Sequence, residues 1–160
     1  QYEEALPYLQ EQMDISYRAF GDVHPMTSAA HWDLGFWYQE QEAYGDAIEQ
    51  YKKDLAICRK LDAAGGGVAG STFITCYDIG GLHVMQSQYD LALPFLVEAY
   101  EGYENLFGDD HPDTISSLEA LVALYEAWHE AEPDGGHDVK AAEYRQLLEE
   151  TKPEAESATP

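Results

Sequence analysis

The chain has 160 residues, with 31 Asp and Glu and only 8 Lys and Arg, which gives a formal net charge of −23. This charge argues against a nucleic-acid partner, because Lys and Arg contacts to phosphate supply most non-specific affinity for DNA and RNA. No segment approaches the roughly 20 apolar residues that cross a bilayer, so we expect no membrane insertion.

Apolar residues at three- and four-residue spacing predict seven helices and an all-α fold. The first ends at the turn Gly21–Pro25, and a glycine-rich stretch at residues 63–70 separates the third from the fourth. No segment shows the period-two alternation of a strand. The polar segment 151–160 is predicted to be a disordered tail. The expected helices span residues 2–20, 27–42, 46–61, 71–86, 89–107, 113–130 and 138–150.

The chain also repeats itself. Residues 1–27 read QYEEALPYLQEQMDISYRAFGDVHPMT and residues 88–114 read QYDLALPFLVEAYEGYENLFGDDHPDT. The small residues that open every second helix are 42, 45 and 49 residues apart, so a unit of about 42 residues with loop insertions accounts for the spacing. These residues are Ala5, Ala47, Ala92 and Ala141. Such a repeat is typical of a solenoid, in which each unit buries its apolar face against its neighbours.

The residues within each unit resemble the tetratricopeptide repeat (TPR) signature, and the GDxHP turn resembles the kinesin-light-chain-like class of 42-residue repeats. The matching residues of one unit are Trp32, Leu34, Gly35, Tyr38, Ala47 and Tyr51. The resemblance implies a right-handed superhelical α-solenoid over residues 1–150. It would consist of a leading half repeat (1–26), two repeats (27–70 and 71–112) and a divergent last repeat (113–150). It further implies a scaffold that binds a peptide or a partner domain, and no enzyme activity.

If the family geometry carries over, the first helix of each unit lines a concave groove. In this class an Asn often contacts the bound peptide, and Asp33 and Asp78 occupy matching positions. Two acids in place of amides favour a cationic partner. We therefore predict an acidic groove with aromatic pockets. The alternative is that Trp32 and Phe36 are core residues, as aromatics on helices usually are. The predicted groove residues are Trp32, Asp33, Phe36, Glu40, Tyr77, Asp78, Val84, Met85, Glu119 and Glu126.

The alternative function is self-assembly. The first helix would present Leu6, Leu9 and Met13 on a side that no earlier repeat covers. A second copy could cover this side and form a dimer or a filament by end-to-end stacking. The high negative charge would oppose such stacking unless salt screens it.

The sequence favours neither a catalytic nor a metal site. Asp109, Asp110, His111 and Asp113 form a cluster of metal-ligand types, but the equivalent earlier turn lacks two of the acids. We expect Asp113 or Thr114 to cap the following helix, and His24 and His111 to bond to loop carbonyls. No nucleotide-binding or hydrolase motif is present, so we expect no cofactor and no metal.

Cys58 and Cys76 are the only cysteines. They fall on successive predicted helices, so a disulfide between them is geometrically possible, but the sequence does not establish one. Two buried thiols that act as small apolar residues are the expected state. Sparse cysteines fit a cytoplasmic location.

Overall fold

The structure is a computed structural model, and it describes residues 4–151. Within this range every secondary-structure element is a helix, and there are no strands. The elements are α1 (Leu6–Phe20), α2 (Pro25–Glu40), α3 (Tyr44–Ala63), α4 (Ser71–Met85), α5 (Tyr89–Phe107), α6 (Pro112–Ala131), the 3-10 turn η1 (Pro133–Gly135) and α7 (His137–Thr151). The predicted all-α class and the seven helices are confirmed.

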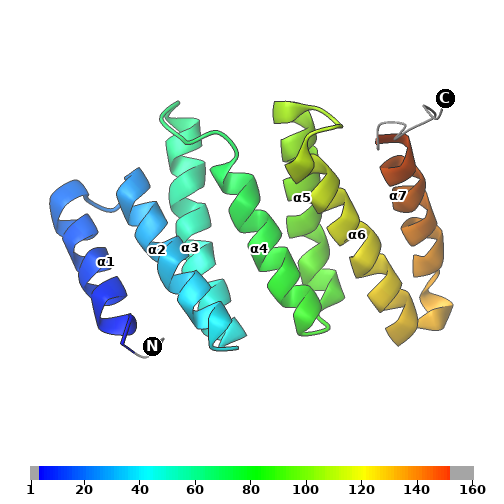
Figure 1. Cartoon of the computed structure of the whole chain (residues 1–160), viewed down its shortest axis with the longest axis horizontal. Coiled ribbons are helices and arrows are strands. Elements are labelled where there is room, and N and C mark those ends of the chain that lie inside the picture. The colour runs from blue at the N-terminus through cyan, green and yellow to red at the C-terminus, as the bar shows by residue number, and fades with distance from the viewer. Residues whose placement is uncertain (1–3, 152–160) are drawn as a thin grey trace, which may run out of the picture. The chain divides into compact units, whose positions relative to one another are not determined.

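The chain divides into two compact units. Unit 1 covers residues 1–82 and unit 2 covers residues 83–160. In unit 1, α2 packs against both α1 and α3, and in unit 2, α6 packs against both α5 and α7. Sequence neighbours thus run antiparallel and side by side within each unit (Figure 1).

The core of unit 1 depends on the close approach of α2 and α3. Tyr51 on α3 is completely buried, and its ring lies against the backbone of Gly35 on α2. A Cβ added at Gly35 would stand 2.7 Å from Cδ1 of Tyr51. Gly35 is therefore required for packing, because any side chain there would overlap a ring that has no room to move.

Unit 2 has a continuous apolar core between α5, α6 and α7. Its buried members come from α5 and α6, and half-buried side chains of α7 close it from the other side. The buried members are Ala92, Leu96, Tyr100, Leu118, Leu121 and Leu124, and Tyr144 and Leu148 are the covering residues of α7. The helix pattern of the sequence accounts for this core, since these positions recur at three- and four-residue spacing.

The repeated GDxHP turn makes the same side-chain contacts in both units. Gly21 and Gly108 end their helices with φ of 84° and 89°, a region that favours glycine. In the first turn the imidazole of His24 stacks on Phe20 with ring centroids 4.4 Å apart, and its Nδ1 accepts a bond from the backbone N–H of Met26. His24 is thus the N-cap of α2.

The second turn repeats these contacts and corrects the predicted capping. Nδ1 of His111 accepts from the backbone N–H of Asp113, and the ring stacks on Phe107 with centroids 4.3 Å apart. The hydroxyl of Thr114 instead donates to the carbonyl of Gly108 at 2.8 Å. The prediction that Asp113 or Thr114 caps the helix while His24 and His111 bond to carbonyls is therefore wrong. The two residue types exchange roles because Pro25 and Pro112 begin the helices, which makes the preceding His the capping position.

This arrangement makes His111→Ala a specific test of the turn. The substitution removes the acceptor for the Asp113 amide and the stacking partner of Phe107, so we expect it to lower the free energy of unfolding by about 1 kcal/mol. His111→Asn keeps a capping acceptor and is expected to lose less. Urea unfolding of the two variants measures the difference, and equal stability of His111→Ala and the wild type would contradict the capping role.

Helix ends differ from the predicted ones by a few residues. α1 begins at Leu6, whereas a start at residue 2 was expected, and residues 1–3 lie outside the described range. α2 ends at Glu40, two residues early, and Glu42 takes a positive φ of 58° in the following turn. Thr151 of the predicted tail belongs to α7, and residues 152–160 lie outside the described range. The repeat boundaries stay a prediction.

Candidate functional site

Three predicted groove residues of unit 1 lie together in the structure. The indole of Trp32 on α2 stacks on Phe36, one helical turn away, with ring centroids 5.6 Å apart. Its Nε1 donates to Oδ2 of Asp78 on α4 at 2.9 Å. Phe36 is 44% exposed and Trp32 is half-buried, so the alternative that both are core residues is wrong for Phe36. We call Trp32, Phe36 and Asp78 the Trp32–Asp78 surface.

The carboxyl group of Asp78 has an unusual protonation equilibrium. Burial raises its pKa from 3.8 to about 6, and the negative charge of nearby Asp54 adds to this rise. The hydrogen bond from Trp32 opposes the rise, because an N–H donor stabilises the ionised form. Asp78 is therefore a carboxylate that is costly to ionise within the protein, and a cation placed beside it would lower that cost.

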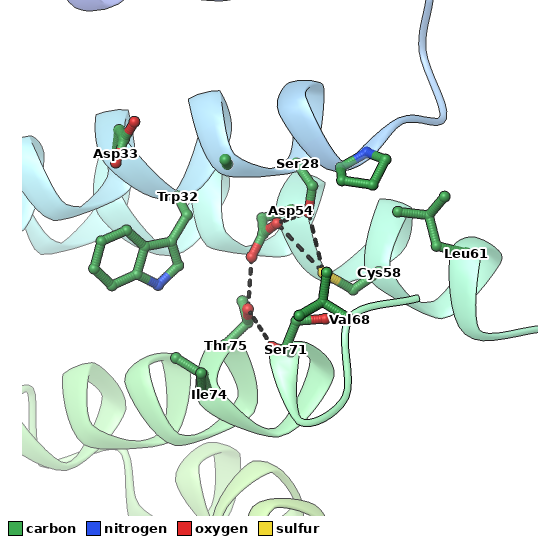
Figure 2. Close-up of a pocket in the computed structure, with 12 residues that line it drawn as sticks. Ser28, Trp32, Asp33, Asp54, Cys58, Leu61, Val68, Ser71, Ile74 and Thr75 are labelled. Atoms are coloured by element: carbon green, nitrogen blue, oxygen red, sulfur yellow. Dashed lines mark hydrogen bonds between the residues drawn. The ribbon is translucent and has the colours of Figure 1, made fainter. Parts of the chain in front are cut away.

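A second acidic group, Asp54 on α3, lies deeper between the same helices (Figure 2). Its side chain is only 3% exposed. Ser28 of α2 donates to its Oδ1, and Thr75 of α4 donates to its Oδ2 at 2.6 Å. Asp54 thereby joins three helices of unit 1 by hydrogen bonds. Burial of polar groups is tolerated when they are hydrogen-bonded in this way.

Asp54, Ser28 and Thr75 were not predicted from the sequence. One signal was available, because Asp54 lies three residues after Tyr51 and four before Cys58, on the buried stripe of its helix. An acidic residue on an otherwise buried stripe indicates a partnered carboxylate. The partners themselves come from two other helices, and no local pattern indicates them.

The other predicted groove residues make different contacts or belong to unit 2. Asp33 is half-buried and accepts a bond from Gln12 of α1 at 2.9 Å, whereas its neighbour Trp32 reaches α4. Tyr77 is 37% exposed and Glu40 is exposed at the end of α2. In unit 2, Met85 and Glu119 are exposed, Val84 packs against the apolar core, and Glu126 pairs with Arg145 of α7. A groove that runs through both units therefore stays a prediction.

The predicted self-assembly residues of α1 are partly covered. Leu6, Leu9 and Met13 are half-buried, and the two most exposed large apolar side chains of this helix are Tyr8 at 73% and Ile15 at 54%. Assembly through α1 stays a prediction that the structure does not test.

The structure describes both cysteines and the acidic turn at Asp109–Asp113. Cys58 and Cys76 are both buried free thiols, and burial raises the pKa of the Cys58 thiol. Within residues 4–151, no group of three or more His, Cys, Asp or Glu side chains is placed to hold a metal ion, at the Asp109–Asp113 turn or elsewhere.

Comparison with known proteins agrees with this architecture. The family model for the tetratricopeptide repeat matches residues 1–60 and 72–133, which is more than half of the chain. The chain belongs to the tetratricopeptide repeat family. Repeats of this family generally mediate protein–protein interaction, and they typically serve as scaffolds without enzyme activity. In the part of this TPR chain that the structure describes, no helix combines the length and the apolar character needed to span a membrane.

Solved TPR structures show the same fold. The chain is similar to a crystal structure of TPR-like repeats assigned to a kinesin light chain of Podosopora anserina, in which the repeats are nearly identical to one another. The sequence identity is 18% and the TM-score is 0.74, and the match covers 99% of this chain and 70% of the other. A point variant of those repeats matches with 19% identity and a TM-score of 0.70 over 95% of this chain and 66% of the other. At this level of sequence identity the similarity shows the fold. The predicted resemblance to the kinesin-light-chain-like class is therefore confirmed for the fold.

Proposed function

We propose that this TPR chain binds a basic segment of a partner protein on the Trp32–Asp78 surface of unit 1. The observation that carries the proposal is the contact between the Trp32 indole and the Asp78 carboxylate, with exposed Phe36 stacked beside it. An aromatic pair provides a flat apolar platform for a side chain, and the carboxylate gives that platform a preference for positive charge.

The electrostatics of the whole chain support the same partner. A net charge of −23 attracts cationic segments over a distance and repels acidic ones. Asp78 adds a local effect, since a cation beside it offsets the desolvation that raises its pKa. An Arg or Lys side chain on Trp32 would also gain a cation–π contact. Aromatic anchors of this kind often dominate binding energies at protein interfaces.

Selection from a random peptide library displayed on phage tests this function, because it lets the chain choose among all peptide chemistries. We expect the selected peptides to be enriched in Arg or Lys next to an apolar residue, and their capture to weaken as salt concentration rises. Panning on the double variant Phe36→Ala, Asp78→Asn controls for binding elsewhere on this acidic protein. Enrichment of acidic peptides, or equal enrichment on the variant, would contradict the proposed surface.

A further inference from the structure

A cavity of about 280 Å³ opens between α2, α3 and α4 within unit 1 (Figure 2). Trp32 lines it, so the cavity is continuous with the Trp32–Asp78 surface. Leu61, Val68 and Ile74 contribute apolar walls, and Val68 and Ile74 are 60% and 45% exposed, which places them toward solvent. The cavity therefore has an apolar wall that can be reached from outside.

The polar part of the cavity is formed by Asp54 and its hydroxyl partners. Ser28 and Thr75 each donate one hydrogen bond to this carboxylate, and both also line the cavity. A carboxylate has about four acceptor positions, so two donors leave capacity for a further one. The Sγ atom of Cys58 lies 3.5 Å from Oδ1 and can occupy a position on that oxygen as a weak donor. Capacity for a further donor therefore remains on the carboxylate.

The walls around this buried carboxylate carry no positive charge. Among the described residues that line the cavity, two are acids, Asp54 and Asp33, and none is Lys, Arg or His. Placing a carboxylate at 3% exposure is costly unless hydrogen bonds or a cation compensate for lost hydration. The hydroxyls of Ser28 and Thr75 supply the hydrogen bonds, and the cavity leaves space for a cation.

The walls determine which cation fits. A small hydrated ion would gain nothing from Leu61, Val68 and Ile74, whereas a long side chain can lay its methylene groups against them. The indole of Trp32 offers a face on which a planar cation can stack. A guanidinium is planar, weakly hydrated and rich in N–H donors, and these properties suit a partly buried carboxylate better than those of an ammonium group.

We propose that this cavity is a specificity pocket for an arginine side chain of the bound partner. The methylene groups lie against Leu61, Val68 and Ile74, and the guanidinium stacks on Trp32 and donates to Asp54. This inference rests on the proposed function, in that it assigns one side chain of the basic segment to one pocket.

NMR titration of the ¹⁵N-labelled chain tests the pocket with a defined probe. The probe is Nα-acetyl-arginine amide, and its control is Nα-acetyl-citrulline amide, which has nearly the same shape and no charge. We expect arginine amide to shift the Trp32 indole N–H and the Thr75 amide saturably, with an affinity at least about tenfold higher than that of citrulline amide. Lysine amide should fall between them, and leucine amide should resemble citrulline amide.

Two variants test whether the shifts caused by arginine amide arise in the cavity. Asp54→Asn is expected to abolish the preference for arginine over citrulline. Because this substitution disturbs a buried network, Ala29→Phe provides a second test, since Ala29 is an exposed residue of α2 that lines the cavity. Phe at this position should block entry and abolish the shifts, whereas Ala56→Phe on the exposed side of α3 should leave them unchanged.

The possible outcomes separate this inference from the proposed function. Equal affinities for arginine and citrulline amides, or arginine shifts that survive Ala29→Phe, would overturn the pocket. If basic library peptides still bind through Phe36 and Asp78, the proposed function stands without it. Saturable arginine-specific shifts at Trp32, together with a library that yields no basic peptide, would support the pocket and contradict the proposed function.

Discussion

Gly35→Ala is expected to destabilise the protein, although alanine is the better helix former. The new Cβ would stand 2.7 and 2.8 Å from Cδ1 and Cε1 of Tyr51, a ring that is completely buried. Overpacking of this kind costs about 1–3 kcal/mol. The higher helix propensity of alanine offsets about 1 kcal/mol of this cost, so we expect a net loss of up to about 2 kcal/mol in the free energy of unfolding.

Gly81→Ala is the matched control for this prediction. Gly81 is also a helical glycine, but a Cβ added there meets no atom within 4 Å. The variant should therefore be more stable than the wild type by about 0.5–1 kcal/mol. Urea unfolding followed by circular dichroism measures both changes. Stabilisation by both substitutions would show that the Gly35–Tyr51 contact does not limit packing between α2 and α3.

Asp78→Asn is expected to stabilise the protein at neutral pH and to change its pH dependence. The folded-state pKa of Asp78 is about 6, above its ordinary value of 3.8, so the folded protein binds the proton more tightly than the unfolded chain. The contribution of Asp78 to stability therefore falls as pH rises from about 4 to 6, and the penalty is complete above 6. A difference of this size corresponds to about 2–3 kcal/mol at pH 7.5.

Asparagine removes the charge and keeps an oxygen that can accept the bond from Trp32. The difference in the free energy of unfolding between Asp78→Asn and the wild type should consequently be near zero at pH 3.5 and should grow to its full value above pH 6. Glu149→Gln is the control, because Glu149 is an exposed acid of α7 without this burial. A constant difference at all pH values would show that Asp78 does not titrate with a raised pKa.

The sequence was sufficient to predict the helices and the repeat, and the reason lies in short-range patterns. The period of apolar residues and the repeated GDxHP turn are local properties, and they indicated the helices to within a few residues. The roles inside the turn were assigned wrongly, because capping by His111 depends on which ring nitrogen faces the helix. Such a preference depends on the rotamer, which the residue type does not specify.

The site was predicted less completely than the fold. Trp32, Phe36 and Asp78 were identified from their positions in the repeat, and the structure adds that they are in contact through the indole. Asp33 and Asp78 were both predicted to line the groove because they occupy equivalent positions in successive repeats, and the structure shows that the Asp33 carboxylate accepts a hydrogen bond from Gln12 of α1. The Asp54 network depends on three helices meeting at one point. Side chains that meet through tertiary packing leave no spacing pattern in the sequence.

Recognition of positive charge in a partner segment by the Asp78 carboxylate is the core of the proposed function. The most direct measurement is calorimetric titration, at pH 7.5, of a basic peptide from the library selection into the wild type, Asp78→Asn and Glu149→Gln, which each lose one negative charge. We expect Asp78→Asn to weaken binding about tenfold and Glu149→Gln to leave it nearly unchanged, because only a close carboxylate contributes more than screened attraction. Equal affinity of the peptide for all three proteins would contradict the claim.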